Sequence, residues 1–130
     1  MSHFTRVKTQ ITDVEVLKRA LADLEHPYAE HTIVRGYQGK NEQAELVVQP
    51  GGAYDIGFTR AGADGAFHVV ADWWGVEREA KLREKAFLEP VMQRYAYHKV
   101  VAEMAKQGFS VVQETVAADQ TVKLTVRRWA

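Results

Sequence analysis

The sequence predicts an α+β fold, an antiparallel sheet of about six to seven strands with two main helices packed on one face. Short runs of alternating apolar and polar residues fill residues 32–76, and turn residues separate them. Two other segments repeat their apolar residues every three or four positions, which is typical of amphipathic helices. The connections between the short runs are too brief for parallel crossovers, so antiparallel pairing is expected.

Composition places the chain among single globular domains. Its 130 residues are 46% hydrophobic and 26% charged, so we expect one domain over residues 1–130. The 17 basic residues balance the 17 acidic ones, which argues against a nucleic-acid partner. The sequence has no apolar run of membrane-spanning length, no cysteine and no secretory signal at its start. These features predict a cytoplasmic protein that does not bind a membrane.

The chain opens with a predicted strand over residues 3–11. Alternate residues share a face, so His3 lies on the same side as Val7 and Ile11. These two apolar side chains mark that side as the inner face of the sheet. The histidine is therefore expected to point toward the core.

A helix is predicted next. Thr12 and Glu15 match a capping box, in which the first residue caps the helix and the second reaches back to it. Apolar residues then follow at helical spacing, namely Val14, Leu17, Leu21 and Leu24. Pro27 marks a loop, so the helix is expected to end near Glu25.

Four strands are predicted between the two helices, and turn residues follow each one. They cover residues 33–38, 44–49, 54–60 and 67–74. The last of them has apolar residues on both faces, which is typical of a central strand. Neighbouring residues of a strand face opposite ways, so only one of Trp73 and Trp74 can enter the helix-covered core.

The second main helix is the most regular amphipathic segment. Residues 77–89 form a charged helical lead-in, and Pro90 is either a kink or the first residue of a new helix. Gly108 is the expected C-cap. One side of this helix collects Phe87, Val91, Arg94, Tyr95, His98, Val101, Ala102 and Ala105.

A final hairpin is predicted over residues 109–116 and 121–129. Its inward side chains are expected to be Val122, Leu124 and Val126. The complete order is then β-α-β-β-β-β-α-β-β. With both helices on one face, the other face of the sheet must be exposed to solvent, covered by a partner or buried in a homodimer.

Arg94 and His98 form the main candidate for a polar site. They lie one helical turn apart within an apolar stripe, where their side chains can meet. If the helix packs on the first strand, His3 joins them, and Asp72 is a further candidate partner. A buried hydrogen-bonded cluster is the preferred interpretation, anion binding the second and metal catalysis the third. The positive charge of Arg94 opposes a cation, so no metal ligand is assigned.

A second candidate set is aromatic and cationic. Trp73 or Trp74 with Arg127 and Trp129 forms a candidate protein interface, because tryptophan and arginine are enriched at interfaces. The same residues could stack on a single-stranded nucleic acid, which the balanced charge disfavours. No phosphate loop, dense metal motif or paired nucleophile is present in the sequence, so no catalytic residue and no cofactor are assigned.

Several motifs lie in a characteristic order along the whole chain. They are Met-Ser-His-Phe-Thr followed by Lys-Thr-x-Ile, Tyr-Asp-Ile-Gly-Phe at 54–58, Asp-Trp-Trp-Gly-Val at 72–76, Gln-Arg-Tyr-Ala-Tyr-His at 93–98, Gly-Phe at 108–109 and Arg-Arg-Trp at 127–129. Together they resemble the hypothetical chloroplast open reading frame thirty-five family of plastids, cyanobacteria and other bacteria. The positions within matching motifs are His3, Tyr54, Asp55, Asp72, Trp73, Trp74, Arg94, Tyr95, Tyr97 and His98.

The resemblance implies a domain of unknown function, so it assigns no catalytic role to any residue. It implies an intracellular location, which is the plastid stroma for plastid-encoded relatives. It also implies an accessory subunit that works beside an AAA-type ATPase or a ferredoxin-like protein.

Taken together, the residues and the resemblance favour a non-enzymatic accessory or adaptor protein in an intracellular complex. A domain that binds a small anionic ligand or single-stranded nucleic acid is the alternative. A metal-dependent enzyme is the third hypothesis.

Overall fold

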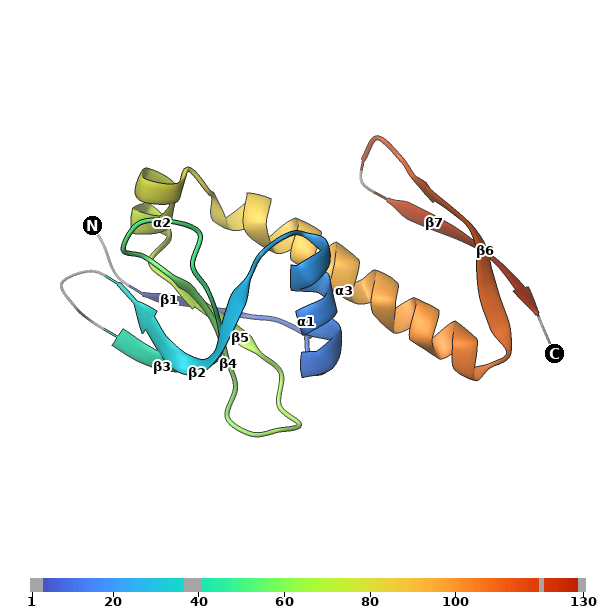
Figure 1. The fold of residues 1–130 in the computed structure, drawn as a ribbon, viewed down its shortest axis with the longest axis horizontal. Coiled ribbons are helices and arrows are strands. Elements are labelled where there is room, and N and C mark those ends of the chain that lie inside the picture. Colours follow the sequence, from blue (N-terminus) through green and yellow to red (C-terminus); the bar gives the residue numbers. More distant parts are fainter. Residues whose placement is uncertain (1–3, 37–40, 120, 129–130) are drawn as a thin grey trace.

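The computed structural model describes residues 4–36, 41–119 and 121–128. His3 and Trp129, two of the candidate site residues, lie outside these ranges. Figure 1 shows the elements in the order β1 (Thr5–Lys8), α1 (Val14–Asp23), β2 (Tyr28–Arg35), β3 (Asn41–Val48), β4 (Ile56–Thr59), β5 (His68–Ala71), α2 (Trp73–Ala80), α3 (Glu84–Lys106), β6 (Phe109–Val116) and β7 (Val122–Arg128).

The strands form two separate antiparallel sheets. Five of them build a sheet in the order β1-β5-β4-β3-β2, and among the described strands β6 pairs only with β7. The predicted α+β class with an antiparallel sheet is confirmed, but the last hairpin does not extend the main sheet. The 23 residues of α3 span about 34 Å at 1.5 Å per residue. The helix therefore carries β6 well past the edge of the main sheet (Figure 1).

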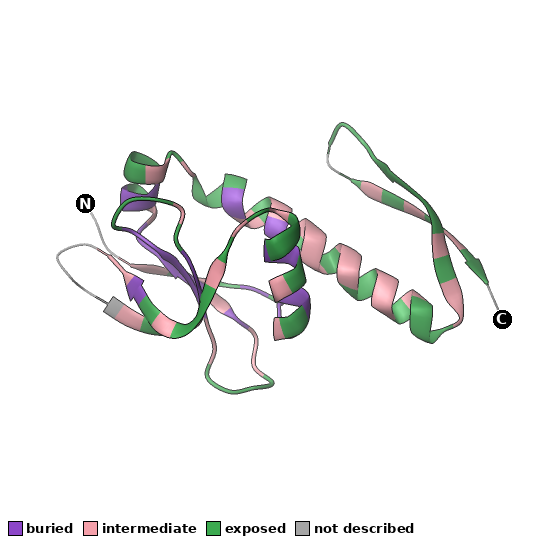
Figure 2. Ribbon diagram, viewed as in Figure 1, coloured by how far each residue is buried: buried purple, intermediate pink, exposed green. Residues whose placement is uncertain are grey.

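The core lies between the main sheet and the helices. Leu17 and Leu21 of α1 and Phe87 and Val91 of α3 are fully buried there. They pack on the sheet residues Leu46, Val48, Ile56, Phe58, Val69 and Ala71. The helices thus cover one face of the sheet, as the sequence predicts. The buried residues of Figure 2 gather in this layer and at the start of α3.

The opposite face of the sheet is partly covered by the β2–β3 hairpin itself. Val34, Ala44 and Val47 are buried there as a small second cluster, with Phe4 packed against it. A Cβ atom at Gly57 would lie only 2.3 Å from Cγ2 of Val34, so the hairpin approaches β4 closely. This part of the face needs neither water nor a partner, because a long hairpin can curve back over its own sheet.

An ion pair holds the far end of that hairpin in place. The Arg35 backbone N–H and Nε each donate to Oδ2 of Asp55 at 2.9 Å, and its Nη2 donates to Oδ1 at 2.9 Å. Asp55 is fully buried, so the guanidinium neutralises a carboxylate that water cannot reach. Its backbone N–H donates in return to the Arg35 carbonyl at 3.1 Å.

The start of α1 differs by one residue from the expected capping box. Oδ1 of Asp13 accepts from the backbone N–H groups of Glu15 and Val16 at 3.1 and 3.2 Å. The backbone N–H of Thr12 instead donates to the Tyr95 hydroxyl at 3.1 Å. Aspartate is as good a cap as threonine, and α3 supplies a partner for the preceding residue. The helix ends at Asp23, two residues before the expected position.

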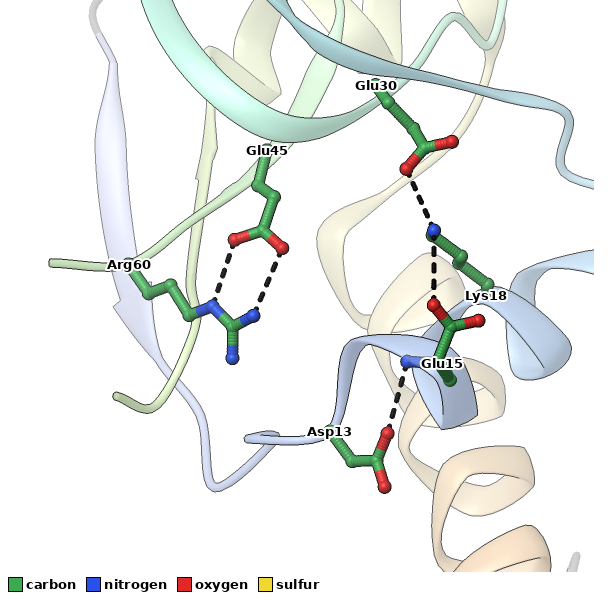
Figure 3. Close-up of polar contacts among 6 residues, drawn as sticks. All are labelled: Asp13, Glu15, Lys18, Glu30, Glu45 and Arg60. Atoms are coloured by element: carbon green, nitrogen blue, oxygen red, sulfur yellow. Dashed lines mark hydrogen bonds and ion pairs between the residues drawn. The ribbon is translucent and has the colours of Figure 1, made fainter. Parts of the chain in front are cut away.

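One ion pair joins α1 to the sheet, and another joins β3 to the residue that follows β4 (Figure 3). Nζ of Lys18 lies 2.8 Å from Glu30 on β2 and 3.5 Å from Glu15 on its own helix. Arg60 makes a two-pronged contact with Glu45 at 2.9 and 3.0 Å. The Arg60 side chain is only 6% exposed, so this pair is part of the packed structure.

The two adjacent tryptophans lie in a helix, which corrects the predicted strand over residues 67–74. β5 ends at Ala71, and Oδ1 of Asp72 then accepts from the Gly75 backbone N–H at 3.2 Å. That bond caps α2, so Trp73 and Trp74 occupy its first turn. The apolar run before Asp72 continues into the helix, which is why the alternation alone suggested one long strand.

Pro90 lies inside α3 and neither starts nor ends a helix. The helix begins at Glu84, six residues before it, and continues to Lys106. Its missing N–H leaves a carbonyl one turn earlier without a helical donor, and that turn is exposed to water. The C-cap is Gln107, one residue before the expected Gly108, which follows it with a φ of 84°.

Candidate functional site

The second half of α3 and the β6–β7 hairpin form an arm, defined here as residues 92–128. Val91 is the last fully buried residue of α3. Among the described residues of the arm, none is buried, as the pink and green colours of Figure 2 show. The arm is therefore held to the domain by a few contacts at its base and is otherwise open.

A polar cluster joins α1, α3 and β6 at the base of the arm. Nε and Nη2 of Arg94 donate to Oδ2 of Asp23 at 3.2 and 3.0 Å. Nε2 of His98 lies 2.6 Å from the same oxygen. Arg94 also reaches β6, with its Nη1 3.6 Å from Oε1 of Glu114. The Arg94 guanidinium lies 4.2 Å from the centre of the Tyr97 ring.

The charges of this cluster shift two pKa values. Partial burial alone would raise the pKa of Asp23, but hydrogen bonds from His98 and Arg94 outweigh it and lower that pKa. A hydrogen bond to Glu114, aided by partial desolvation, raises the pKa of Tyr97. Asp23 therefore stays ionised and neutralises Arg94.

This arrangement suits a structural junction better than a ligand site. An incoming anion would have to displace Asp23 or Glu114 from Arg94. A metal ion would meet the positive charge of the same guanidinium. Within the described residues, no group of three or more histidine, aspartate or glutamate side chains is arranged to hold a metal ion. The cluster links the arm to the domain through ion pairs and hydrogen bonds.

The structure unites some of the predicted site residues and separates others. Arg94 and His98 meet at Asp23, as their spacing suggested, although both are half-buried and not fully buried. Asp72 lies away from them, where it caps α2. Its Oδ2 atom and the Trp73 indole nitrogen are buried without a hydrogen-bond partner in the described structure.

The two carboxylates of the cluster, Asp23 and Glu114, were missed by sequence reasoning. Asp23 left one usable signal. An acidic residue in the last turn of a helix opposes the helix dipole, and α1 has no basic residue in that turn. Such a carboxylate is stabilised when a cation from another element lies beside it, and Arg94 is that cation. For Glu114 the alternation of the hairpin predicts only the face on which it lies.

The proposed aromatic and cationic surface is divided between distant parts of the molecule. Trp74 is 48% exposed and stacks with Arg78, whose guanidinium lies 4.3 Å from the ring centre. Arg127 belongs to β7, at the opposite end of the molecule from α2 (Figure 1). Trp73 packs against the core at Phe87, with ring centres 6.1 Å apart. Trp74 and Arg127 therefore do not form one continuous site.

The arm carries an exposed apolar surface along α3. Met92, Ala96 and Val100 follow each other at intervals of four residues, so they form one ridge of the helix. Met92 is 40% and Val100 46% exposed. The ridge separates two shallow hollows of about 400 and 420 Å³. One hollow lies between α3 and β7 and is lined by Gln93, Ala96, Tyr97, Val100, Val122 and Leu124.

The structure thus defines a small α+β protein whose arm bears a ridge of exposed apolar side chains. Comparison with protein families identifies it further. Residues 20–125 match the family described as a protein of unknown function, DUF1257, and the chain belongs to this family. The matched region contains most of the domain and nearly all of the arm. No solved structure matches the chain.

Relatives of similar length support the assignment. An uncharacterized protein ycf35 of Guillardia theta is 37% identical over 136 residues, which cover 99% of this chain and 98% of the relative. The ycf35 proteins of Pyropia yezoensis and Cyanophora paradoxa are 33% and 28% identical, with the same coverage of both chains. The family resemblance deduced from the motifs is confirmed. Among the described helices, none has the length and apolar character that crossing a membrane requires.

Proposed function

We propose that the protein is a non-enzymatic accessory or adaptor subunit that binds a protein partner through its arm. The observation that carries this proposal is the exposed ridge of Met92, Ala96 and Val100 between two apolar hollows. Contiguous exposed apolar side chains beside a hollow are typical of interaction surfaces. The ridge is also a helical face of the kind that packs into a groove of another protein.

The hairpin supports the same conclusion. An isolated pair of strands is only marginally stable in water, and β6–β7 has one partly exposed apolar face. Among the described residues, its main contacts outside the hairpin are with α3, including the ion pair between Glu114 and Arg94. A partner that covers the ridge and the inner face of the hairpin would shield both apolar surfaces from water.

The partner classes to test first are an AAA-type ATPase and a ferredoxin-like protein, and a second copy of the chain is the alternative. The proposed compartment is the cytoplasm, or the plastid stroma for relatives encoded in a plastid. Arg94 is already neutralised by Asp23, which makes a small anionic ligand at this point less favourable.

Site-specific photo-crosslinking in cells tests the proposal. A photoreactive amino acid is placed at Val100 on the ridge, or at Ile33 on β2 as a matched control, since both are exposed apolar positions. We expect a discrete crosslinked product at Val100 that is absent at Ile33. Mass spectrometry identifies the partner, and a product containing only this chain indicates a homodimer. Equal, diffuse labelling at both sites together with a monomeric mass by light scattering would refute the proposal.

A further inference from the structure

Strand β7 has an open edge. It pairs with β6 on one side, and no strand among the described residues pairs with its other side. Every second residue of such a strand points its backbone N–H and C=O groups away from the sheet. An open edge of this kind is a template for a further strand from another chain.

The same strand concentrates positive charge. Val122–Arg128 contains Lys123, Arg127 and Arg128 and no acidic residue, whereas the whole chain has 17 basic and 17 acidic residues. Lys123 and Arg127 are exposed and make no ion pair within the part of the chain that the structure describes. Their neighbours across the hairpin are Thr115 and Ser110, which carry no charge.

The two faces of β7 differ in chemistry. Val122 and Leu124 border the hollow beside α3 and are partly buried. Lys123 and Arg127 alternate with them and therefore point to the opposite face. A strand that complements this edge has apolar residues on the α3 side and acidic residues on the other side.

The charge also argues against self-association at this edge. Antiparallel pairing of β7 with β7 of a second copy would bring basic residues close to one another across the new ladder. Like charges at directly opposed positions are destabilising. A lysine in an edge strand is a common protection against this kind of pairing. The edge therefore suits a partner of opposite charge.

We propose that β7 accepts an extended acidic segment of a partner protein as a third strand of the β6–β7 sheet. This inference rests on the proposed function, because it names the chemistry of the segment that the arm binds. The third strand forms hydrogen bonds with the open backbone groups of β7. Its apolar side chains lie beside the hollow, and its carboxylates lie beside Lys123 and Arg127. It also converts a marginal two-stranded ribbon into a three-stranded sheet.

Fluorescence anisotropy with a labelled peptide of alternating valine and glutamate tests this inference. We expect saturable binding that weakens as salt is added, and no binding of the matching valine and lysine peptide. The double substitution Lys123→Glu with Arg127→Glu is expected to weaken binding about tenfold or more, because two attractions become repulsions. Lys8→Glu with Arg19→Glu changes the net charge equally at exposed sites outside the arm and is expected to leave binding unchanged.

Changes in the peptide test strand addition without relying on the folding of any variant. N-methylation of alternate residues removes one set of backbone donors at a time. Strand addition predicts that one set abolishes binding and the other set is tolerated, with hydrogen-exchange protection of β7 in the bound state. Equal effects of the two sets, or no binding at low salt, would overturn the inference.

Two further outcomes separate this inference from its alternatives. Tighter binding of labelled oligothymidine than of the peptide, lost in the Lys123→Glu and Arg127→Glu variant, would assign the basic edge to nucleic acid and overturn the inference. A Val100 crosslink to a partner without any peptide binding would overturn strand addition and leave the adaptor function standing. Absence of the Val100 crosslink together with absence of peptide binding would refute both the adaptor function and strand addition.

Discussion

Phe87 anchors α3 to the domain, so its truncation should be among the most damaging changes in the protein. Its ring is fully buried and lies among three other rings, with centre distances of 5.0 Å to His26, 6.2 Å to Phe58 and 6.1 Å to Trp73. Phe87→Ala removes the ring and leaves a cavity between the helix and the sheet. The neighbouring rings belong to different elements and cannot all collapse into that space.

The expected cost of Phe87→Ala follows from comparable buried truncations, which lose about 3–5 kcal/mol. A domain of this size has a free energy of unfolding of about 5–15 kcal/mol, so the variant loses a large share of its stability. With a urea m value of about 2 kcal/mol/M, the midpoint should fall by about 2 M. Tryptophan fluorescence follows the transition, because Trp73 packs beside the substituted ring.

Met92→Ala is the matched control on the same helix. Met92 is 40% exposed, so its truncation should cost no more than about 1 kcal/mol. A loss below about 1 kcal/mol for Phe87→Ala, or an equal loss for both variants, would show that α3 is not held by its first two turns. The division of α3 into an anchored half and a free half would then be wrong.

Three further predictions concern charge and close packing. Asp23→Asn should remove a stabilising contribution that is present above pH 3.8, the ordinary pKa, and is lost as the pH falls through the lowered pKa of the folded state. The urea midpoints of the variant and the native protein should therefore converge in acid. A difference that stays constant with pH would contradict this prediction. Burial lowers the pKa of His26, so the unfolded state binds a proton first as the pH falls below 6.5, and the free energy of unfolding declines there. His26→Gln should make this decline with pH less steep. If the slope of unfolding free energy against pH is unchanged, another group causes the decline. Gly75→Ala would place a Cβ atom 2.2 Å from the Tyr54 ring and should cost about 1–3 kcal/mol in thermal or urea unfolding. As a control, Gly62→Ala places its Cβ where no atom lies within 4 Å, so it should be nearly neutral. Similar values for both variants would argue against close packing of α2 on the Tyr54 ring.

The sequence by itself determined the local structure of most elements and the side of each one that faces the core. The apolar spacing of α1 and of the first half of α3 predicted which sides of these helices enter the core. The positions of Arg94 and His98 placed them on one face, and Gly108 marked the end of the helix. Short connections with turn residues predicted antiparallel strands. All of these features depend on residues within a few positions of one another, where backbone preference and periodicity act directly.

Only the tertiary structure decided which distant residues meet. Asp23 binds Arg94 and His98 across 71 and 75 positions of the chain, and no local pattern selects that pairing. The same is true of the curved β2–β3 hairpin over Gly57, because the alternation of a strand does not encode how far it bends. The separation of Trp74 from Arg127 has a similar origin, since a cap at Asp72 turns the chain into α2 while α3 carries β7 to the far end. Local periodicity determines the face of each element, but packing between the elements determines which faces meet.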